Sequence, residues 1–368
     1  MVVLVMAWFG VWDLQAQQPQ AQQTAPTEYK TLPIADQYKL PDRATVTDRA
    51  TFNEQRRQVM NRRRSMQTAV SELLKNKSSS VSANEMETFF NGYVIPLMTQ
   101  IDEESLAELG KNREIFFRSY LGPASGQMRD RVLQLVFPAM QQIAEDNFHP
   151  ACRVNATVFV SQLDQREGNR SARQLPVPYP AALNWMRKVV SEDTLPTYLK
   201  PAAIAGIERH AAVRGPQTSQ PFSDQEAAQL ASEMVTVMQL NPEEVAGIDP
   251  DLVYWMKRRA IRTLGYIGSS NSAGVLRGLI MDDKQDMKIR REAIAAYGML
   301  DFSQDKAEAQ LSTVVPKIGE LLAKAADEEA KYIDKKISDI RMTVKFLDGR
   351  DAAASDSGSR KKDSGLGM

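Results

Sequence analysis

One helical sequence recurs along this chain, most clearly as Met256-Lys257-Arg258-Arg259-Ala260-Ile261-Arg262-Thr263-Leu264-Gly265-Tyr266-Ile267 and as Lys288-Ile289-Arg290-Arg291-Glu292-Ala293-Ile294-Ala295-Ala296-Tyr297-Gly298-Met299-Leu300. Two earlier copies surround Ala156 and Ala203. Each of the four copies has a basic residue three positions before the shared alanine: Arg153, Lys200, Lys257 and Arg290. Such self-similarity is typical of stacked helical units, which build a surface for binding and need no active site.

Each copy is expected to be the second helix of a pair, because an amphipathic stretch precedes it. The four candidate first helices span residues 127–143, 181–190, 224–239 and 272–281. Ser223 with Glu226 forms a capping-box pattern that starts the third of these helices. No run has the alternation and β-branched enrichment of a strand. The sequence therefore predicts an all-α fold, with the polar loops 165–180 and 214–221 accounting for the uneven spacing of the copies.

The residue types within the copies suit close helix packing. Small residues such as Ala260 and Ala293 allow two helix axes to approach. Gly265 and Gly298 each cost about 1 kcal/mol of helix propensity relative to alanine. We therefore expect both glycines at close backbone contacts. Carboxylates precede the basic position in several copies, so ion pairs or contacts with backbone carbonyls are expected between repeats.

The copies around Lys257 and Arg290 resemble HEAT repeats of the armadillo-like superhelical family. The stretch 148–156 is similar to a repeat start in secreted bacterial HEAT-repeat proteins of unassigned function. In the copy at Lys200, Glu208 and His210 replace the small and apolar residues of the pattern. The resemblance covers residues 126–301 and implies a curved α-solenoid used for protein–protein interaction or scaffolding.

The remainder of the chain divides around this repeated region. Residues 1–16 are typical of a signal peptide, since an apolar run is followed by a small residue at Ala16, and residues 17–46 are expected to form a flexible linker. Residues 47–125 form a predicted helical N-terminal section, in which the pattern Ser82–Glu85 is a second capping box and Pro96 should bend or end a helix. HEAT-like repeats follow at 126–301, then a C-terminal helical cap at 302–347 and a disordered tail at 348–368.

Composition argues against several classes of function. Lys plus Arg and Asp plus Glu number 46 each, and this neutral balance disfavours a nucleic-acid binder. The single cysteine excludes an intrachain disulfide, and with only two histidines the chain has few candidate ligands for a metal site. The N-terminal apolar run is shorter than the roughly 20 residues that span a bilayer. An exported protein of the periplasm or another envelope compartment, without a transmembrane span, is therefore expected.

Candidate chemical residues have simpler structural interpretations. His149 and Cys152 are close in sequence but lack further ligands, and His210 ends a helix, where a partly positive imidazole suits the dipole. The acid pairs Glu243-Glu244, Asp249 with Asp251, and Asp282-Asp283 adjoin helix ends. Five arginines are expected on the solvated face of a long helix: Arg56, Arg57, Arg62, Arg63 and Arg64.

The aromatic residues are better candidates for binding, although a core role is favoured for them: Tyr179, Trp185, Tyr254 and Trp255. Aromatic residues with arginine are typical of interface hot spots, and Tyr254-Trp255 precedes a group of basic residues that cannot all face inward: Lys257, Arg258, Arg259 and Arg262. The sequence predicts no catalytic residue, no cofactor and no metal. It favours a non-enzymatic protein–protein interaction or scaffolding module of the cell envelope. The alternatives are an envelope enzyme or lyase on an α-solenoid, a HEAT-like nucleic-acid-binding protein, and a self-assembling structural component.

Overall fold

The computed structural model describes residues 28–169, 171–172, 174–215, 218, 221–302, 312–321, 323–324 and 327. The predicted signal peptide (1–16), the start of the predicted linker, most of the predicted cap (302–347) and the predicted tail (348–368) lie outside these residues. The described part of the chain is predominantly helical, which confirms the all-α prediction.

Three α-helices form the N-terminal section: α1 (Arg49–Leu74), α2 (Ala83–Phe89) and α3 (Glu103–Phe116). A π-helical turn extends α2 over Phe90–Val94, and another extends α3 over Phe117–Leu121. The second helix ends before Pro96, which starts a short 3-10 turn, as the proline predicted. The two π-helical turns have no counterpart in the sequence analysis.

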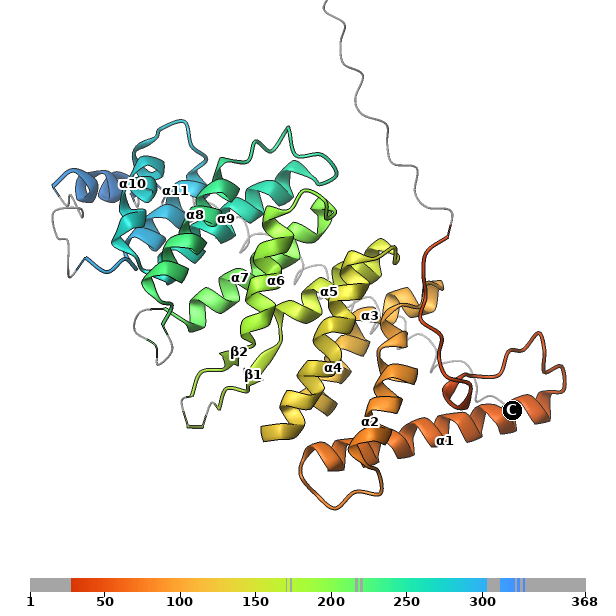
Figure 1. The fold of residues 1–368 in the computed structure, drawn as a ribbon. Helices are drawn as coiled ribbons and strands as arrows, with labels where there is room; N and C mark the ends of the chain where they lie inside the picture. The colour runs from red at the N-terminus through yellow and green to blue at the C-terminus, as the bar shows by residue number, and fades with distance from the viewer. Residues whose placement is uncertain are drawn as a thin grey trace, which may run out of the picture.

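Between residues 126 and 297, eight further α-helices follow as four consecutive pairs: α4 (Gly126–Glu145) with α5 (Pro150–Ser161), α6 (Pro180–Ser191) with α7 (Lys200–Val213), α8 (Asp224–Gln239) with α9 (Pro250–Ile267), and α10 (Ala273–Met281) with α11 (Met287–Tyr297). The described residues 312–321 are also helical. The members of each pair contact each other. The second helices also contact in series, α5 with α7, α7 with α9 and α9 with α11. The pairs therefore follow one another along the molecule, with α1 at the opposite end from α10 and α11 (Figure 1).

Local sequence explains where these helices begin and end. Both predicted capping boxes are present: the Ser82 and Ser223 side chains accept from the amides of Glu85 and Glu226, whose carboxylates accept from the serine amides. Prolines occupy the first position of α5, α6 and α9, where no backbone donor is needed. The last of these helices ends at Gly268, whose φ of 72° is the left-handed conformation that favours glycine.

The four shared alanines occupy equivalent positions in the structure. Ala156, Ala203, Ala260 and Ala293 lie on the second helices of the four pairs and are fully buried. Gly265 is also at a close contact, because a Cβ added there would lie 2.7 Å from Ala296 Cα on α11. The same prediction is wrong for Gly298, which follows the last residue of α11 and has only its own last turn nearby.

The basic residue shared by the four copies contacts a backbone carbonyl at two of the four sites. Arg153 Nε donates to Ala144 O over 2.8 Å, and Arg290 Nη2 donates to Ile280 O over 2.8 Å. Each guanidinium thereby satisfies a carbonyl near the end of the first helix of its own pair. Carbonyl contacts are therefore present, but they lie within a pair, so the prediction that they join one repeat to the next is wrong at these two sites. In the second copy Lys200 Nζ instead lies 3.4 Å from Asp193 Oδ1.

Residues 28–38, which the sequence assigns to a linker, lie against the helical section. Lys30 N donates to Asn147 O over 2.9 Å, and Ala35 N donates to Gly92 O over 2.8 Å. The Tyr38 ring is buried against the rings of Phe89 and Tyr93. The structure therefore differs from the expected flexible linker over these residues, because one aromatic side chain anchors the segment.

A two-stranded antiparallel ribbon departs from the all-helical expectation. It consists of β1 (Asp164–Arg166) and β2 (Val177–Pro178), with Asp164 opposite Pro178. Both strands lie in the segment between α5 and α6 that the sequence treats as a loop. They are too short to show an alternating pattern, so periodicity could not reveal them.

Candidate interaction surface

Helix α9 contacts α8 within its pair and the second helices α7 and α11 on either side. The side of α9 that these three helices leave uncovered carries aromatic and basic side chains. Tyr254 is exposed, and Trp255, Arg258, Arg259 and Arg262 are partly exposed. We call these five residues, together with Glu208 of α7 and Glu292 of α11, the α9 strip.

Ion pairs connect the strip across three helices. Arg259 Nη1 lies 2.6 Å from Glu208 Oε2, and Arg258 Nη2 lies 2.6 Å from Glu292 Oε1. Arg262 Nε donates to Glu292 Oε2 over 2.7 Å. The Arg259 guanidinium also lies over the Trp255 ring, 4.5 Å from its centroid. Three cations on α9 are therefore held in position by one carboxylate from each neighbouring second helix.

The titration of Glu292 reflects this arrangement. Burial alone would raise the pKa of Glu292, but hydrogen bonds from Arg262 and Arg258 outweigh burial and lower the pKa below its usual value. The same hydrogen bond raises the pKa of Arg262. The pair therefore stays ionised at neutral pH.

A related ion pair joins α7 to the ribbon. Arg209 Nη2 contacts Asp164 Oδ2, while burial raises the pKa of Asp164 and Arg209 opposes that shift. Asp164 Oδ1 and Arg209 Nη1 are buried and make no hydrogen bond with other described groups. This pair therefore fixes the ribbon against α7 rather than one second helix against the next.

Sequence reasoning found the cations and rings of the strip but not its carboxylates. From the sequence, Glu208 is only a residue that departs from the repeat pattern. Glu292 occupies the same place in its copy as Arg259 does in the preceding copy. Opposite charges at one register of adjacent copies are a signal that could have predicted contact between α9 and α11.

The other two candidate aromatics pack inside the molecule. Trp185 is buried, and its Nε1 donates to Glu145 Oε1 over 2.7 Å. Tyr179 is half-buried with its ring 5.3 Å from that of Phe137. The core interpretation therefore holds for Trp185 and Tyr179, whereas Tyr254 and Trp255 belong to the α9 strip.

His149 and Cys152 have structural contacts. His149 precedes α5, where its Nδ1 accepts a hydrogen bond from Ala151 N over 3.2 Å. Cys152 is buried with its Sγ 3.8 Å from Gln100 O, and burial raises the pKa of the thiol to about 11. A thiol that keeps its proton at neutral pH is a poor nucleophile.

His210 differs from its sequence interpretation. The side chain is fully buried on α7, and burial followed by the charges of Arg209 and Arg214 lowers its pKa to about 3. The imidazole is therefore neutral at pH 7, and the expectation of a partly positive ring at a helix end is wrong. Both ring nitrogens lack a hydrogen-bond partner among the described residues.

The acid pairs serve local roles where the structure gives them contacts. Asp249 caps α9 by accepting from Asp251 N over 2.8 Å, and Asp282 accepts from Lys284 N over 3.0 Å. Asp283 Oδ1 lies 3.0 Å from Arg290 Nη1. Glu243 and Glu244 are exposed in the segment between α8 and α9. Among the described residues, no group of three or more His, Cys, Asp or Glu side chains is arranged to hold a metal ion.

The five arginines of α1 do not behave alike. Arg56, Arg57, Arg62 and Arg64 are exposed, which agrees with the predicted solvated face. Arg63 is half-buried: its Nε donates to Tyr38 O over 2.8 Å, and its guanidinium lies 4.7 Å from the centroid of the Tyr93 ring. For this residue the solvated interpretation is wrong, because it fastens the N-terminal segment to α1.

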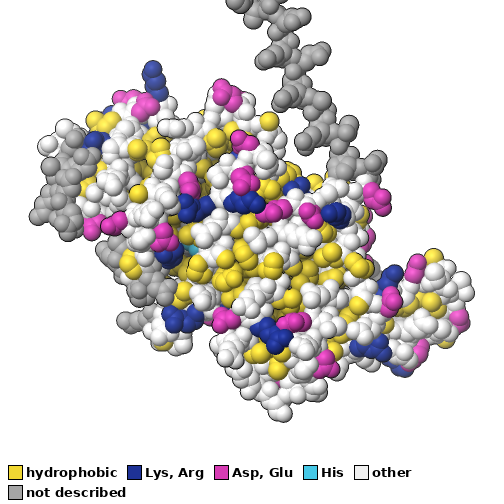
Figure 2. Space-filling view, in the orientation of Figure 1, with side chains coloured by type: hydrophobic (Ala, Val, Ile, Leu, Met, Phe, Trp, Pro, Cys, Tyr) yellow, Lys and Arg dark blue, Asp and Glu magenta, His cyan; other side chains and the backbone are white. Residues whose placement is uncertain are grey.

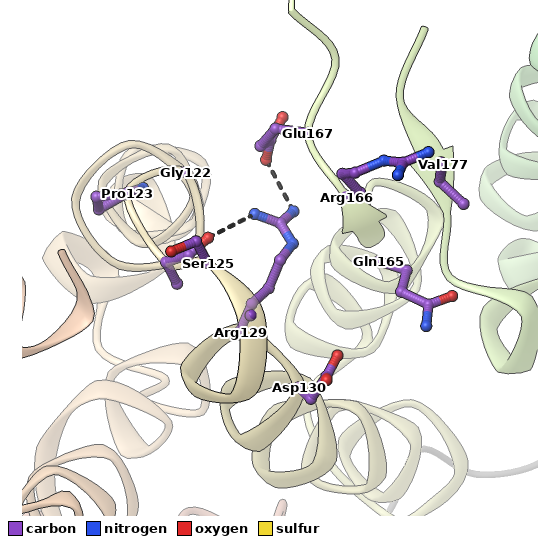
Figure 3. A pocket seen from close by; sticks show the side chains of 11 residues that line it. Gly122, Pro123, Ser125, Arg129, Asp130, Gln165, Arg166, Glu167 and Val177 are labelled. Atoms are coloured by element: carbon purple, nitrogen blue, oxygen red, sulfur yellow. Dashed lines mark hydrogen bonds and ion pairs between the residues drawn. The ribbon is translucent and has the colours of Figure 1, made fainter. Parts of the chain in front are cut away.

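A cleft of about 600 Å³ lies between the start of α4 and the ribbon (Figure 3). Arg129 points from α4 towards Glu167, whose carboxylate it contacts at 3.0 Å. The same guanidinium donates to the carbonyl oxygens of Asp164 and Leu121, each over 2.8 Å. The most buried cation of the cleft is therefore fully engaged by the protein itself and joins α4 to the ribbon.

Charges on the face drawn in Figure 2 alternate rather than gather by sign. Acidic and basic side chains lie next to one another in a row, with apolar side chains between them. Ion pairs also join neighbouring first helices, namely Lys188 of α6 with Glu145 of α4 and Arg187 of α6 with Glu233 of α8. This face carries no broad patch of one charge.

Every helix in the described part of the chain is too short or too polar to cross a bilayer. Comparisons with protein-family models, with curated proteins and with solved structures give no match.

Proposed function

We propose that this chain is a non-enzymatic protein–protein interaction module, built as an α-solenoid of HEAT-like helix pairs and exported to the cell envelope. The α9 strip carries this proposal. It combines an exposed tyrosine, a tryptophan and three oriented arginines, which are the residue types enriched at interface hot spots.

The arrangement of the helix pairs supports the solenoid part of the proposal. The four copies of the repeated sequence lie on the second helices of four consecutive pairs, and each second helix contacts the next one. In a solenoid, each repeat buries its apolar face against its neighbours only, and the second helices present a continuous surface. The α9 strip lies on such a surface, with contributions from three repeats.

Photocrosslinking tests the interaction face directly. Tyr254 is replaced by the photoreactive p-benzoylphenylalanine in the full chain, produced in its own cells. Met60 on α1, whose exposure of 45% matches the 44% of Tyr254, is the control position. We expect a protein adduct of defined mass at position 254 that is absent at position 60 and weakened by Trp255→Ala. Identical adducts at both positions, or none at 254, would refute the proposed face.

Fractionation tests export separately. The apolar run at residues 2–12 and Ala16 lead us to expect the mature chain in an envelope fraction, with its N-terminus beginning after Ala16. Recovery from the cytoplasm with Met1 retained would contradict export. That result would leave the crosslinking experiment unaffected, since the α9 strip does not depend on the compartment.

A further inference from the structure

The two signs of charge lie at different depths in the α9 strip. The carboxylate side chains of Glu208 and Glu292 are 9% and 13% exposed. The three arginine side chains are 35%, 31% and 36% exposed: Arg258, Arg259 and Arg262. A partner approaching this side of α9 therefore meets guanidinium groups first, with the carboxylates beneath them.

Some donors of these guanidinium groups are unused. A guanidinium has five N–H donors in a planar fork. Arg259 uses Nη1 on Glu208, whereas its Nε and Nη2 donate to no described group. Arg258 uses Nε and Nη2 on Glu292, and its Nη1 has no partner in the part of the chain that the structure describes. Because Glu208 and Glu292 hold the forks in place, less side-chain entropy is lost when a partner accepts the remaining hydrogen bonds.

Aromatic surface adjoins these donors. Tyr254 is exposed one position before Trp255, and the Trp255 ring stacks on the Arg259 guanidinium. A ligand complementary to this arrangement needs acceptor oxygens beside apolar groups. Carboxylate side chains interspersed with apolar ones meet both requirements.

The buried carboxylates disfavour a nucleic-acid backbone as the occupant. Glu208 and Glu292 offset two of the three arginine charges of the strip, and Asp164 offsets Arg209 on the neighbouring helix. A phosphate backbone gains most of its affinity from many uncompensated cations. A short acidic protein segment needs only a few directed hydrogen bonds, and these the strip supplies.

We infer that the α9 strip binds an acidic segment of a partner protein, in which Asp or Glu residues are interspersed with apolar side chains. This inference rests on the proposed function and specifies the chemistry of its partner. The arginines donate hydrogen bonds to the partner's carboxylates, and the rings of Tyr254 and Trp255 cover its apolar side chains.

Fluorescence anisotropy with the full chain tests this inference. The probe is a fluorescein-labelled pool of 14-residue peptides with Asp or Glu at alternate positions and Leu, Phe or Val between them. A second pool replaces the acids with Gln and Asn, and a labelled 14-nucleotide oligothymidine is the third probe. We expect binding of the acidic pool alone, weakened by raising NaCl from 0.05 to 0.5 M because charge–charge attraction is screened.

Two variants make the test specific to the strip. Arg258→Gln leaves Glu292 paired with Arg262, and it should weaken binding of the acidic pool by roughly tenfold, as the loss of a charge-assisted hydrogen bond implies. Arg131→Gln is the matched control, since Arg131 is 40% exposed and pairs with one carboxylate, Glu87, away from the strip. It should leave binding unchanged.

The outcomes separate this inference from the proposed function. Equal binding of the neutral pool, binding of the oligothymidine in preference to the acidic pool, or an equal loss in both arginine variants would overturn it. If the acidic pool fails to bind while the photocrosslink at Tyr254 persists, the strip is still an interaction face and the acidic partner chemistry is wrong.

Discussion

The contact between α9 and α11 at Gly265 can be tested by adding a single methyl group. In Gly265→Ala the new Cβ would lie 2.7 Å from Ala296 Cα, and the two helices must move apart by about 0.7 Å to restore an ordinary contact of 3.4 Å. Overpacking of this kind costs roughly 1–3 kcal/mol. Replacing a helical glycine with alanine returns about 1 kcal/mol. The expected net change in the free energy of unfolding is a loss of about 0–2 kcal/mol.

A control glycine isolates the clash from helix propensity. Gly110 lies within α3, and a Cβ added there meets nothing within 4 Å. Gly110→Ala should therefore stabilise the chain by about 0.5–1 kcal/mol. Urea unfolding followed by far-UV circular dichroism compares the two variants, whose free energies should differ by about 1–3 kcal/mol. Gly265→Val, with a larger side chain, should cost more than Gly265→Ala. If Gly265→Ala stabilised the chain as much as Gly110→Ala does, the close approach of α9 to α11 would be wrong.

Three further predictions concern buried or half-buried polar groups. Because the pKa of His210 is about 3 in the folded chain and about 6.5 when unfolded, the unfolded state binds the extra proton between these values. The free energy of unfolding should therefore fall by about 1.4 kcal/mol per pH unit, relative to that of His210→Leu, as the pH drops from about 6.5 towards 3. Urea titrations at several pH values measure this difference. If the free energies of the two proteins changed in parallel with pH, a buried neutral imidazole would be contradicted. Arg63→Ser should destabilise the folded chain by roughly 1–2 kcal/mol, because the hydrogen bond to Tyr38 O is lost. Arg64→Ser should change the free energy of unfolding by no more than about 0.5 kcal/mol. Equal urea midpoints for the two variants would show that Arg63 does not anchor the N-terminal segment. Arg290→Leu should lower the free energy of unfolding by about 1–3 kcal/mol, because Ile280 O loses its donor. Amide hydrogen exchange at the end of α10 should also become faster. Unchanged exchange there would refute this role of Arg290.

Much of the helical architecture could be predicted because its signals are local. The capping boxes at Ser82 and Ser223 depend on residues three positions apart, and both are present. The shared alanines report a packing requirement that repeats with each second helix, so Ala260 and Ala293 could be assigned to the core from the sequence alone. Periodicity of this kind survives without any knowledge of the tertiary structure.

The features that escaped prediction depend on contacts between distant segments. Arg63 has the sequence context of a solvated residue, and only the docking of Tyr38 against α1 gives it a partner. Gly298 matches Gly265 in register, but its helix ends there, so the packing role of one glycine did not transfer to the other. For the candidate surface, the sequence indicated Tyr254, Trp255 and the arginines, but the carboxylates come from other helices and needed the fold to bring them close.

The arginine that closes the end of the first helix within a pair has a consequence for how the chain can be cut. Since Arg290 satisfies the end of α10 within its own pair, detachment of the α10–α11 pair would keep that contact, and the backbone bond it would break is the one from Asp301 N to Gly268 O at the end of α9. Adjacent pairs otherwise share packing surface and side-chain ion pairs such as that of Arg258 with Glu292. A protease acting on the folded protein would therefore remove whole helix pairs from the C-terminal end, and its stable fragments would end in the connections between pairs rather than inside a helix.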